Sequence, residues 1–145
     1  MRLILQRVSR AAVRVAGAEV GRIGAGILIL AGVETGDGPE QVAAAVRKIS
    51  GLRIFEDAEG QMNLDGAAVG AELLVVSQLT LAGSLAKGRR PSFDGAAPPE
   101  VAEPLVESLV EGLRATGYRV ATGRFRTHME VELVNDGPVT FVLDT

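Results

Sequence analysis

Residues 71–81, AELLVVSQLTL, are the part of the sequence that most clearly indicates a buried strand. The apolar side chains from Leu73 to Val76 follow one another with no polar residue between them, which is typical of a strand covered on both faces. Such a strand lies inside a sheet and not at its edge. The segment therefore predicts the central strand of the fold.

The sequence before this strand predicts further strands joined by tight turns. Residues 2–33 contain short apolar runs separated by glycines, which indicates three or four short strands. The glycine-rich piece GRIGAG, residues 21–26, leads into another strand-like run and has no Lys-Ser or Lys-Thr pair after it. It lacks the context of the phosphate-binding fingerprints, so we interpret its glycines as turn residues.

Two amphipathic helices are expected. The first begins at Pro39, a residue suited to the first helical position, and ends near Gly51. Its apolar residues recur with helical spacing at Val42, Ala45, Val46 and Ile49. The second helix falls within residues 98–117 and ends at Gly117. Its expected apolar face consists of Val101, Leu105, Leu109 and Leu113.

The remaining segments predict strands and loops. The expected strands are residues 52–55 (LRIF), 118–123 (YRVATG), 128–134 (HMEVELV) and 139–144 (VTFVLD). Residues 56–70 predict a polar loop, and residues 82–99 lack any periodicity, which in a compact domain usually marks a functional or disordered loop. No linker or repeat interrupts the chain. Residues 1–145 are therefore expected to form a single α/β domain of layered β-sheets with two main helices.

The composition excludes several classes of site. The chain has no cysteine and one histidine, His128, so neither a disulfide framework nor a thiolate or two-histidine zinc site is expected, and no motif indicates a cofactor. Aromatic residues make up 3% of the chain, which disfavours a surface of stacked rings for single-stranded nucleic acid. With a net charge of −3, any nucleic-acid partner must be held by a local basic patch.

No segment indicates export or membrane insertion. The apolar run near the first residue has three members, and the longest run, GILILAGV at residues 26–33, is far shorter than the roughly 18 to 20 residues that span a bilayer. We expect a soluble, cytoplasmic protein with no membrane partner.

The first candidate site lies at the end of the central strand. If the strand continues through residues 77–81, Ser77, Leu79 and Leu81 share one face, and Gln78 and Thr80 share the other. Polar groups at the carboxyl end of a buried strand often border ligand sites in α/β folds. Serine and threonine also cap free backbone groups where a strand ends, so both interpretations remain open.

The second candidate is NDGPVT, residues 135–140, between the last two expected strands. Proline cannot donate to a sheet ladder and is confined to edges, bulges and turns. The Gly137-Pro138 step is thus either a hairpin turn or a rigid element that contacts a substrate, and prolines with a cis peptide bond tend to occur in such tight turns.

The third candidate is the basic loop KGRRPSF, residues 87–93. Lys87, Arg89 and Arg90 place three positive charges within four residues, which suits phosphate contacts but also describes an ordinary solvated surface. His128 falls in an alternating segment whose core-facing residues would be Met129, Val131 and Leu133. It is therefore expected to be solvated, and no Ser-His-Asp triad can be assigned.

Several of these segments together resemble the D-aminoacyl-tRNA deacylases. The segments MRLILQRVSRA, LRIFED followed by MN, VVSQLTL, KGRRPSF, APPE and NDGPVT occur in the same order and at the same spacing as in that family. The resemblance extends over essentially all 145 residues. It implies an α/β fold, a homodimer and hydrolysis of the ester between a D-amino acid and the 3′-terminal adenosine of tRNA, without a cofactor or metal.

The resemblance also implies roles for particular residues. Ser77, Gln78 and Thr80 would be the catalytic motif, lining a pocket at the dimer interface together with Leu79. Gly137-Pro138 would be cis and would reach into the partner's pocket, where main-chain carbonyls accept hydrogen bonds from the substrate ammonium and leave no room for an L side chain. Glycyl-tRNA, including glycine mischarged on tRNA(Ala), would then be a second substrate. Phe125 and Met129 would contact the substrate, and Lys87, Arg89 and Arg90 would hold tRNA phosphates.

This chain departs from the family pattern at three places. Position 79 is Leu where Phe is usual. The segment from Phe125 to Met129 contains Arg126-Thr127 where Gly-Ala is common, close to the adenosine pocket of relatives. The Tyr that often follows the Thr-Leu pair is missing.

Two alternative functions remain open at this stage. One is a nucleic-acid-binding protein that does not hydrolyse its ligand. The other is a small-molecule esterase that uses Thr80. Because no base is placed beside Thr80, attack by water assisted by the tRNA ribose hydroxyl is favoured over a threonine nucleophile. Backbone N–H groups near Leu79 and Thr80 are the expected oxyanion donors.

Overall fold

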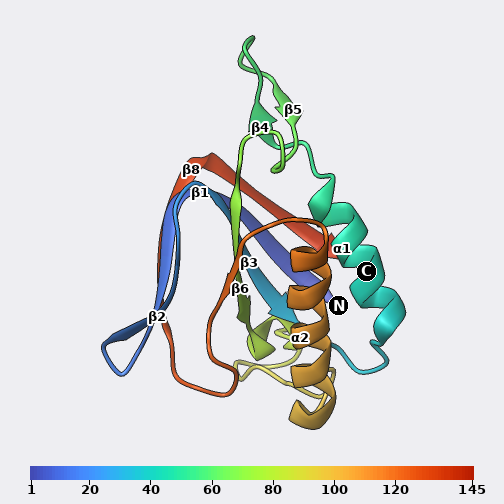
Figure 1. The fold of residues 1–145 in the computed structure, drawn as a ribbon. Coiled ribbons are helices and arrows are strands. Elements are labelled where there is room, and N and C mark those ends of the chain that lie inside the picture. The colour runs from blue at the N-terminus through green and yellow to red at the C-terminus, as the bar shows by residue number, and fades with distance from the viewer.

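The computed structural model describes all 145 residues (Figure 1). Two α-helices, a short 3₁₀ helix and eight strands follow one another along the chain. Their order is β1 (Arg2–Val15), β2 (Ala18–Ile23), β3 (Gly26–Gly32), α1 (Pro39–Ser50), β4 (Phe55–Glu56), β5 (Met62–Leu64), β6 (Glu72–Ser77), η1 (Leu79–Ala82), α2 (Pro99–Ala115), β7 (Val120–Thr122) and β8 (Glu130–Asp144). The predicted α/β class with two main helices is confirmed.

The main sheet has the strand order β2-β1-β3-β6-β7, and β8 pairs with β1. The neighbours β3 and β6, and β6 and β7, are parallel, whereas β1 pairs antiparallel with β2, β3 and β8. The strand β6 therefore lies inside the sheet, as its unbroken apolar run predicts. Leu73 and Val75 belong to the core under the helices, and Leu74 and Val76 belong to a second core on the other face.

Both helices cover the same face of the sheet, and they lie side by side in Figure 1. Of the predicted apolar face of α1, Val42, Ala45 and Ile49 are buried, and Val46 is partly buried against the same core. The buried residues of α2 are Ala102, Leu109, Val110 and Leu113. Val101, which was expected on this face, is 42% exposed because the packed face is turned by one residue toward Ala102. Neither helix has the length and apolar character needed to cross a bilayer.

The sheet curls until its two edges nearly meet. Arg119 on the approach to β7 donates from Nη1 to the carbonyl oxygen of Arg22 on β2 at 3.3 Å. A Cβ atom at Gly21 would lie 2.4 Å from the carbonyl oxygen of Thr122, so only glycine allows β2 to approach β7 this closely. The second core fills the inside of this curled sheet and includes Val8, Ala11, Val13, Ile23 and Leu28.

The N-terminal strands differ from the prediction in length. Three strands occur between residues 2 and 33, but the first, β1, is a single strand of 14 residues and not a short one. Along one edge it pairs with β3 over Arg2–Val8 and then with β2 over Ala11–Val15, and along its other edge it pairs with β8 over Arg2–Arg14. One long strand thus takes the place of the separate short strands that were predicted.

The segment after α1 is also different from the prediction. Residues 52–54 are not a strand. Instead β4 and β5 form a two-stranded hairpin that projects from the body of the protein (Figure 1). The Asp57 carboxylate accepts hydrogen bonds from the N–H groups of Glu59 and Gln61, which closes the turn. The polar composition that predicted a loop therefore reflects a hairpin with two exposed faces.

The last strand contains the Asn-Asp-Gly-Pro segment within it. β8 runs from Glu130 to Asp144 and keeps the same partner, β1, on both sides of that segment. Asn135 pairs with Val8 and Thr140 pairs with Gln6, so four residues of β8 bulge out opposite the single residue Arg7. The expectation of two separate strands is wrong, and so is the hairpin-turn alternative, because the chain does not reverse direction there.

Candidate functional site

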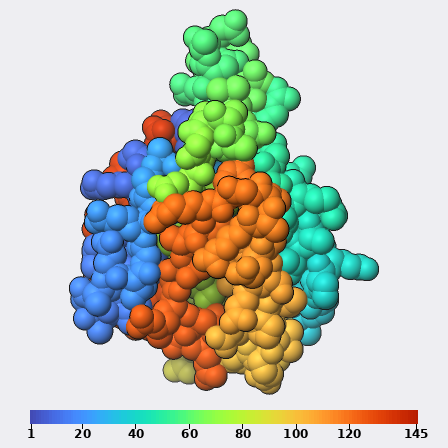
Figure 2. All heavy atoms as spheres, in the orientation of Figure 1, coloured from blue at the N-terminus to red at the C-terminus, as the bar shows by residue number.

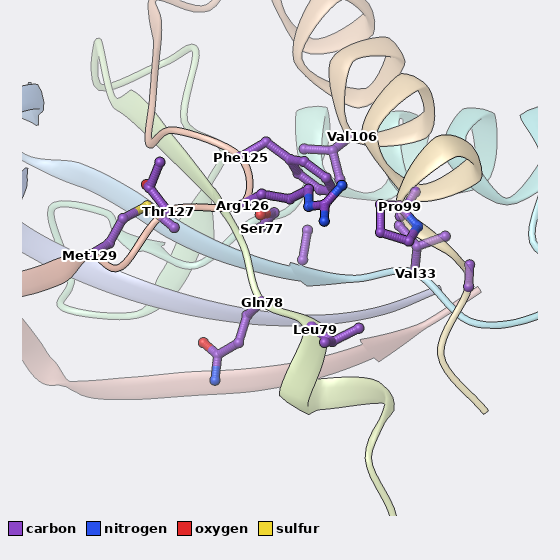
Figure 3. Close-up of a pocket in the computed structure, with 13 residues that line it drawn as sticks. Val33, Ser77, Gln78, Leu79, Pro99, Val106, Phe125, Arg126, Thr127 and Met129 are labelled. Atoms are coloured by element: carbon purple, nitrogen blue, oxygen red, sulfur yellow. The ribbon is translucent and has the colours of Figure 1, made fainter. Parts of the chain in front are cut away.

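A pocket of about 370 Å³ opens at the carboxyl end of β6. Its volume falls in the range of roughly 300 to 1,000 Å³ that is usual for small-molecule sites. The end of β3, the start of α2 and the loop between β7 and β8 form its walls (Figure 3). The lining is mostly apolar: Ala31, Val33, Leu79, Ala97, Pro99, Ala102, Val106, Phe125 and Met129, with Ser77, Gln78, Arg126 and Thr127 as its polar members.

The structure brings together five of the residues that the sequence indicated. Ser77, Gln78, Leu79, Phe125 and Met129 all line this pocket. They come from two parts of the chain about fifty residues apart, which the parallel pairing of β6 and β7 places side by side. The other indicated residues do not line it: Thr80, Gly137, Pro138, Lys87, Arg89 and Arg90.

The segment Ser77–Thr80 does not continue as a strand. β6 ends at Ser77, the N–H of Gln78 donates to the carbonyl oxygen of Ala31 at 2.8 Å, and the chain then enters the 3₁₀ helix. The predicted alternation therefore stops at Ser77, and Leu79 is 56% exposed instead of sharing a strand face with it. In Figure 3 the Gln78 side chain points away from Ser77, to the opposite side of the chain.

Thr80 lies beside the pocket and interacts with Gln78. The Gln78 Nε2 atom donates to the Thr80 hydroxyl oxygen at 3.1 Å. Leu79 and Thr80 begin the 3₁₀ helix, where the first N–H groups have no intrahelical acceptor. The hydroxyl is exposed, and none of its contacts is a histidine or a carboxylate.

The loop between β7 and β8 forms one wall of the pocket. The Thr127 hydroxyl donates to the carbonyl oxygen of Arg124 at 2.8 Å, and the Arg124 N–H contacts the Met129 sulfur at 3.4 Å. These contacts hold Phe125 against the core under the helices. Figure 2 shows the hollow between α2 and this segment, with green atoms of β6 visible at its floor.

A second cavity of about 330 Å³ adjoins the first in the same region and shares Ser77, Val106 and Phe125 with it. It is lined by charged side chains of α2, among them Glu103, Glu107 and Glu111. Arg114 and Arg124 also line it, so this cavity is polar, whereas the first pocket offers mainly apolar surface.

The Gly137-Pro138 peptide bond is cis, as the resemblance implies. Asn135 braces the bulge from within: its Oδ1 accepts from the Val139 N–H at 2.8 Å, and its Nδ2 donates to the Thr140 hydroxyl at 2.9 Å. Both Gly137 and Pro138 remain exposed in the isolated chain. The bulge therefore presents main-chain atoms of fixed orientation to the surroundings.

Arg7, which is not among the candidate residues predicted from the sequence, supports the bulge from the sheet. It is the only charged residue that is buried, at 6% exposure. Its Nε donates to the Asp136 carbonyl oxygen at 3.0 Å and its Nη1 to the Ile54 carbonyl oxygen at 2.7 Å. The sequence does contain a signal for a buried Arg7. Side chains alternate between the two faces of a strand, so Arg7 lies on the same face as the core residues Leu3 and Leu5.

Gly137 occupies a position that other residues would strain. Its φ of +138° is a conformation that L side chains rarely adopt. A Cβ atom there would lie 2.6 Å from the Val139 side chain and 3.2 Å from Nη2 of Arg7. The glycine is thus required by both the backbone and the contact with Arg7.

The basic loop is closed at its base by a pair of backbone hydrogen bonds between Ser84 and Ser92, at 2.7 and 2.9 Å. Lys87, Arg89 and Arg90 lie in the exposed part between them, and the ion pairs of the chain involve none of the three.

The titratable groups offer no conventional hydrolytic machinery. His128 is exposed, as predicted, and its neighbours in the alternating segment, Met129, Val131 and Leu133, pack on the second core. No cluster of three His, Cys, Asp or Glu side chains is arranged to hold a metal ion. The groups available near Thr80 are main-chain N–H groups, the Gln78 amide and hydroxyls.

Comparison with known proteins agrees with this geometry. A family model described as D-Tyr-tRNA(Tyr) deacylase matches residues 4–144. A D-aminoacyl-tRNA deacylase of Geobacter sulfurreducens (strain ATCC 51573 / DSM 12127 / PCA) is 55% identical over 145 residues, covering 100% of this chain and 95% of the relative.

Two solved structures have the same fold. One, described as a c-Myc DNA unwinding element binding protein, has a TM-score of 0.94 at 40% identity and covers 100% of this chain and 99% of its own. The other, a probable eukaryotic D-amino acid tRNA deacylase, has a TM-score of 0.85 at 20% identity with 99% and 98% covered. Since the family model and the bacterial relative both span nearly the whole sequence, this chain belongs to the D-Tyr-tRNA(Tyr) deacylase family of hydrolases.

Proposed function

We propose that the protein hydrolyses the ester bond of D-aminoacyl-tRNA and releases a free D-amino acid and tRNA. The observation that carries this proposal is the position of Ser77, Gln78 and Leu79 at an apolar pocket, in a chain 55% identical over its full length to a D-aminoacyl-tRNA deacylase. The substrate implies the cytoplasm as its place of action.

The pocket is suited to the terminal adenosine. Val33, Ala97, Pro99 and Val106 offer apolar surface for a base, and Phe125 adds an aromatic ring. With the base there, the ribose and its ester extend to the side where Gln78 and Thr80 begin the turn after β6. The reacting carbonyl then lies near the first N–H groups of the 3₁₀ helix.

The chemistry uses water and main-chain donors. Thr80 receives a hydrogen bond from Gln78 and has no base to take its proton, so it is a poor nucleophile. We assign the attack to a water molecule assisted by the free ribose hydroxyl of the tRNA. The N–H groups of Leu79 and Thr80 stabilise the negative charge on the carbonyl oxygen as water adds.

The Gly137-Pro138 bulge selects the D enantiomer across a dimer. Its exposed main-chain carbonyls, held by Arg7 and Asn135, accept hydrogen bonds from the substrate ammonium bound in the partner's pocket. An L side chain would have to occupy the same space, so it is excluded by contact. Glycine has no side chain and passes, which makes glycyl-tRNA, including glycine mischarged on tRNA(Ala), a second substrate.

An apolar row on the sheet supports the homodimer. Ile4 pairs with Val142 on one side and with Leu30 on the other, so the three side chains point to the face opposite the helices. Val142, at the open end of the row, is 63% exposed. A surface of this kind beside the Gly137-Pro138 bulge is a suitable contact for a second copy, and light scattering measures whether the protein is a dimer.

The basic loop positions the acceptor end of the tRNA. Lys87, Arg89 and Arg90 carry exposed charges without internal partners and therefore suit phosphate contacts. Such contacts fix the register of the nucleic acid without reading its sequence. They would also make tRNA binding weaker at higher salt.

A second candidate function is nucleic-acid binding without hydrolysis. It is favoured by the structural neighbour at 40% identity, which is described as a DNA unwinding element binding protein. The two candidates differ in one observable. A deacylase releases amino acid from tRNA, whereas a binder shifts tRNA in a gel and leaves the ester intact.

The experiment combines both observables on one sample. Purified protein is incubated with labelled D-aminoacyl-tRNA, and the reaction is divided between a gel-shift assay and an assay for released amino acid. A simple activated ester without tRNA serves as a third substrate. Release from tRNA with little cleavage of the simple ester supports the deacylase, and a shift without release supports the binder.

A further inference from the structure

Arg126 is the only charged residue that lines the apolar pocket. In Figure 3 its side chain extends across the pocket toward Pro99 at the start of α2. The residue is exposed, and it takes part in none of the ion pairs of the chain. A guanidinium without a partner at the mouth of an apolar cavity is available to an anionic ligand.

The backbone at Arg126 adopts a conformation that favours glycine. Its φ is +57°, and the only other residue besides glycine with a positive φ is Ala16, in the tight turn between β1 and β2. A left-handed conformation costs a residue with a Cβ atom about 1–2 kcal/mol. Such unfavourable conformations are found mainly at functional sites, where surrounding contacts enforce them.

The contacts that enforce this conformation come from the same short loop. The hydrogen bond from Thr127 to Arg124 and the contact of Arg124 with the Met129 sulfur close the loop on both sides of Arg126. Phe125 is held against the core. The loop thereby holds the Arg126 side chain over the mouth of the pocket.

We propose that Arg126 binds the phosphate on the 5′ side of the terminal adenosine of the substrate tRNA. This inference rests on the proposed function, because it takes the base to lie in the apolar pocket and the 3′ ester to lie toward Gln78 and Thr80. The one anionic group that remains on the terminal nucleotide is its 5′-phosphate. The planar guanidinium fork matches two phosphate oxygens, which the ammonium of lysine cannot do.

The contact has a consequence for substrate choice. A simple aminoacyl ester, or an aminoacylated nucleoside, lacks the 5′-phosphate and loses this interaction. Arg126 thus makes the site prefer an ester that ends a polynucleotide chain. It acts in addition to the basic loop, whose charged residues do not line the pocket.

The test compares two small probes, adenosine and adenosine 5′-monophosphate, by calorimetry at low salt. The wild-type protein is expected to bind the monophosphate at least about tenfold more tightly than adenosine, since hydrogen bonds between charged groups are the strong ones. Arg126→Gly should reduce this ratio to near one. Arg126→Lys should retain only part of it, and Arg47→Ala, which removes an exposed arginine on α1, should leave it unchanged.

The glycine variant also provides a check on folding. Because glycine adopts a positive φ without strain, Arg126→Gly should have a melting temperature equal to or higher than that of the wild type. The phosphate preference is then lost without any loss of stability, which damage to the fold cannot produce.

The inference is overturned if the wild type binds both probes equally or binds neither, or if Arg126→Gly keeps the full preference. The probe assay needs no hydrolysis, so its failure is separate from failure of the proposed function. Hydrolysis of D-aminoacyl-tRNA without a phosphate preference refutes only the role of Arg126. A phosphate preference without hydrolysis refutes the deacylase and keeps the nucleotide site.

Discussion

Arg7 and Asp136 are joined across the sheet by a hydrogen bond from the Arg7 Nε to the Asp136 main-chain carbonyl oxygen at 3.0 Å. The same guanidinium donates to the Ile54 carbonyl oxygen at 2.7 Å. The buried arginine thus ties the residue before Gly137 to the base of the β4–β5 hairpin. The carboxylates of Glu56 and Asp136 lie 3.7 and 3.6 Å from it and balance its charge.

We predict that Arg7→Lys destabilises the protein and weakens enantiomer selection. A single ammonium cannot reproduce both main-chain hydrogen bonds, and unsatisfied buried acceptors cost about 1–3 kcal/mol each. The free energy of unfolding from urea titration should fall by about 2 kcal/mol. The ratio of D- to L-ester hydrolysis should fall in the same variant. Unchanged stability together with an unchanged ratio would refute a positioning role for Arg7.

Gly137→Ala should remove most activity toward D-aminoacyl-tRNA. The added Cβ atom lies 2.6 Å from the Val139 side chain, so the bulge must shift. The matched control is Gly60→Ala at the hairpin tip, where φ is +76° and no atom lies within 4 Å of the added Cβ. Both variants bear the cost of a positive φ, about 1 kcal/mol. Only Gly137→Ala should lose activity, by at least about tenfold. Equal activities of the two variants would contradict a role for the Gly137-Pro138 bulge in the active site.

Thr80→Ala should retain activity within about tenfold of the wild type. The hydroxyl accepts a hydrogen bond from Gln78 and has no base beside it, so its removal costs a polar contact and not a nucleophile. Single-turnover rates with saturating protein isolate the chemical step from binding. If Thr80 were the nucleophile, the rate would fall by several powers of ten, as it does when catalytic nucleophiles are removed.

Glu72→Gln should lower stability in a pH-dependent way. The Gly24 N–H donates to the Glu72 carboxylate at 2.8 Å and Arg119 pairs with it, so the pKa of Glu72 lies below the ordinary 4.5. A lowered pKa contributes stability above pH 4.5, and this contribution is lost as the pH falls through the folded-state value. The variant should be less stable by about 1 kcal/mol at pH 7.

The same deficit should shrink as the pH falls below about 4.5, because the carboxylate is protonated first in the unfolded state and, at lower pH, also in the folded state. Urea titrations at several pH values between 7 and 3 measure it, and Glu59→Gln on the exposed hairpin is the control. A stability deficit that grows on acidification would contradict a lowered pKa for Glu72, and with it the stabilisation of its carboxylate by Gly24 and Arg119.

The parts of the fold that depend on local pattern could be predicted from the sequence. The central strand, the start and end of α1 and the exposed position of His128 all follow from runs, spacing and caps. The packed face of α2 could not be placed, because Val101 and Ala102 are both apolar and only tertiary contacts decide between them. The continuity of β8 through Gly137-Pro138 could not be predicted either, because it depends on pairing with β1, far away in the sequence.

In the candidate site, too, local pattern predicts some features and tertiary contacts decide the others. Ser77, Gln78 and Leu79 were found because the strand that carries them is conspicuous, but the break at Ser77 depends on the contact of Gln78 with Ala31. Arg7 carried a usable signal in its alternation with Leu3 and Leu5. No signal in the sequence indicated the pocket wall formed by Pro99 and Val106, because an apolar residue on a helix face predicts core as readily as a ligand pocket.

The most direct measurement is the release of tyrosine from D-Tyr-tRNA and from L-Tyr-tRNA, followed side by side with the same purified protein. We predict rapid hydrolysis of the D-ester and, for the L-ester, a rate equal to that in buffer. Equal hydrolysis of both esters would contradict selection by the Gly137-Pro138 bulge. If both esters are hydrolysed only at the rate seen in buffer, the deacylase function itself is contradicted.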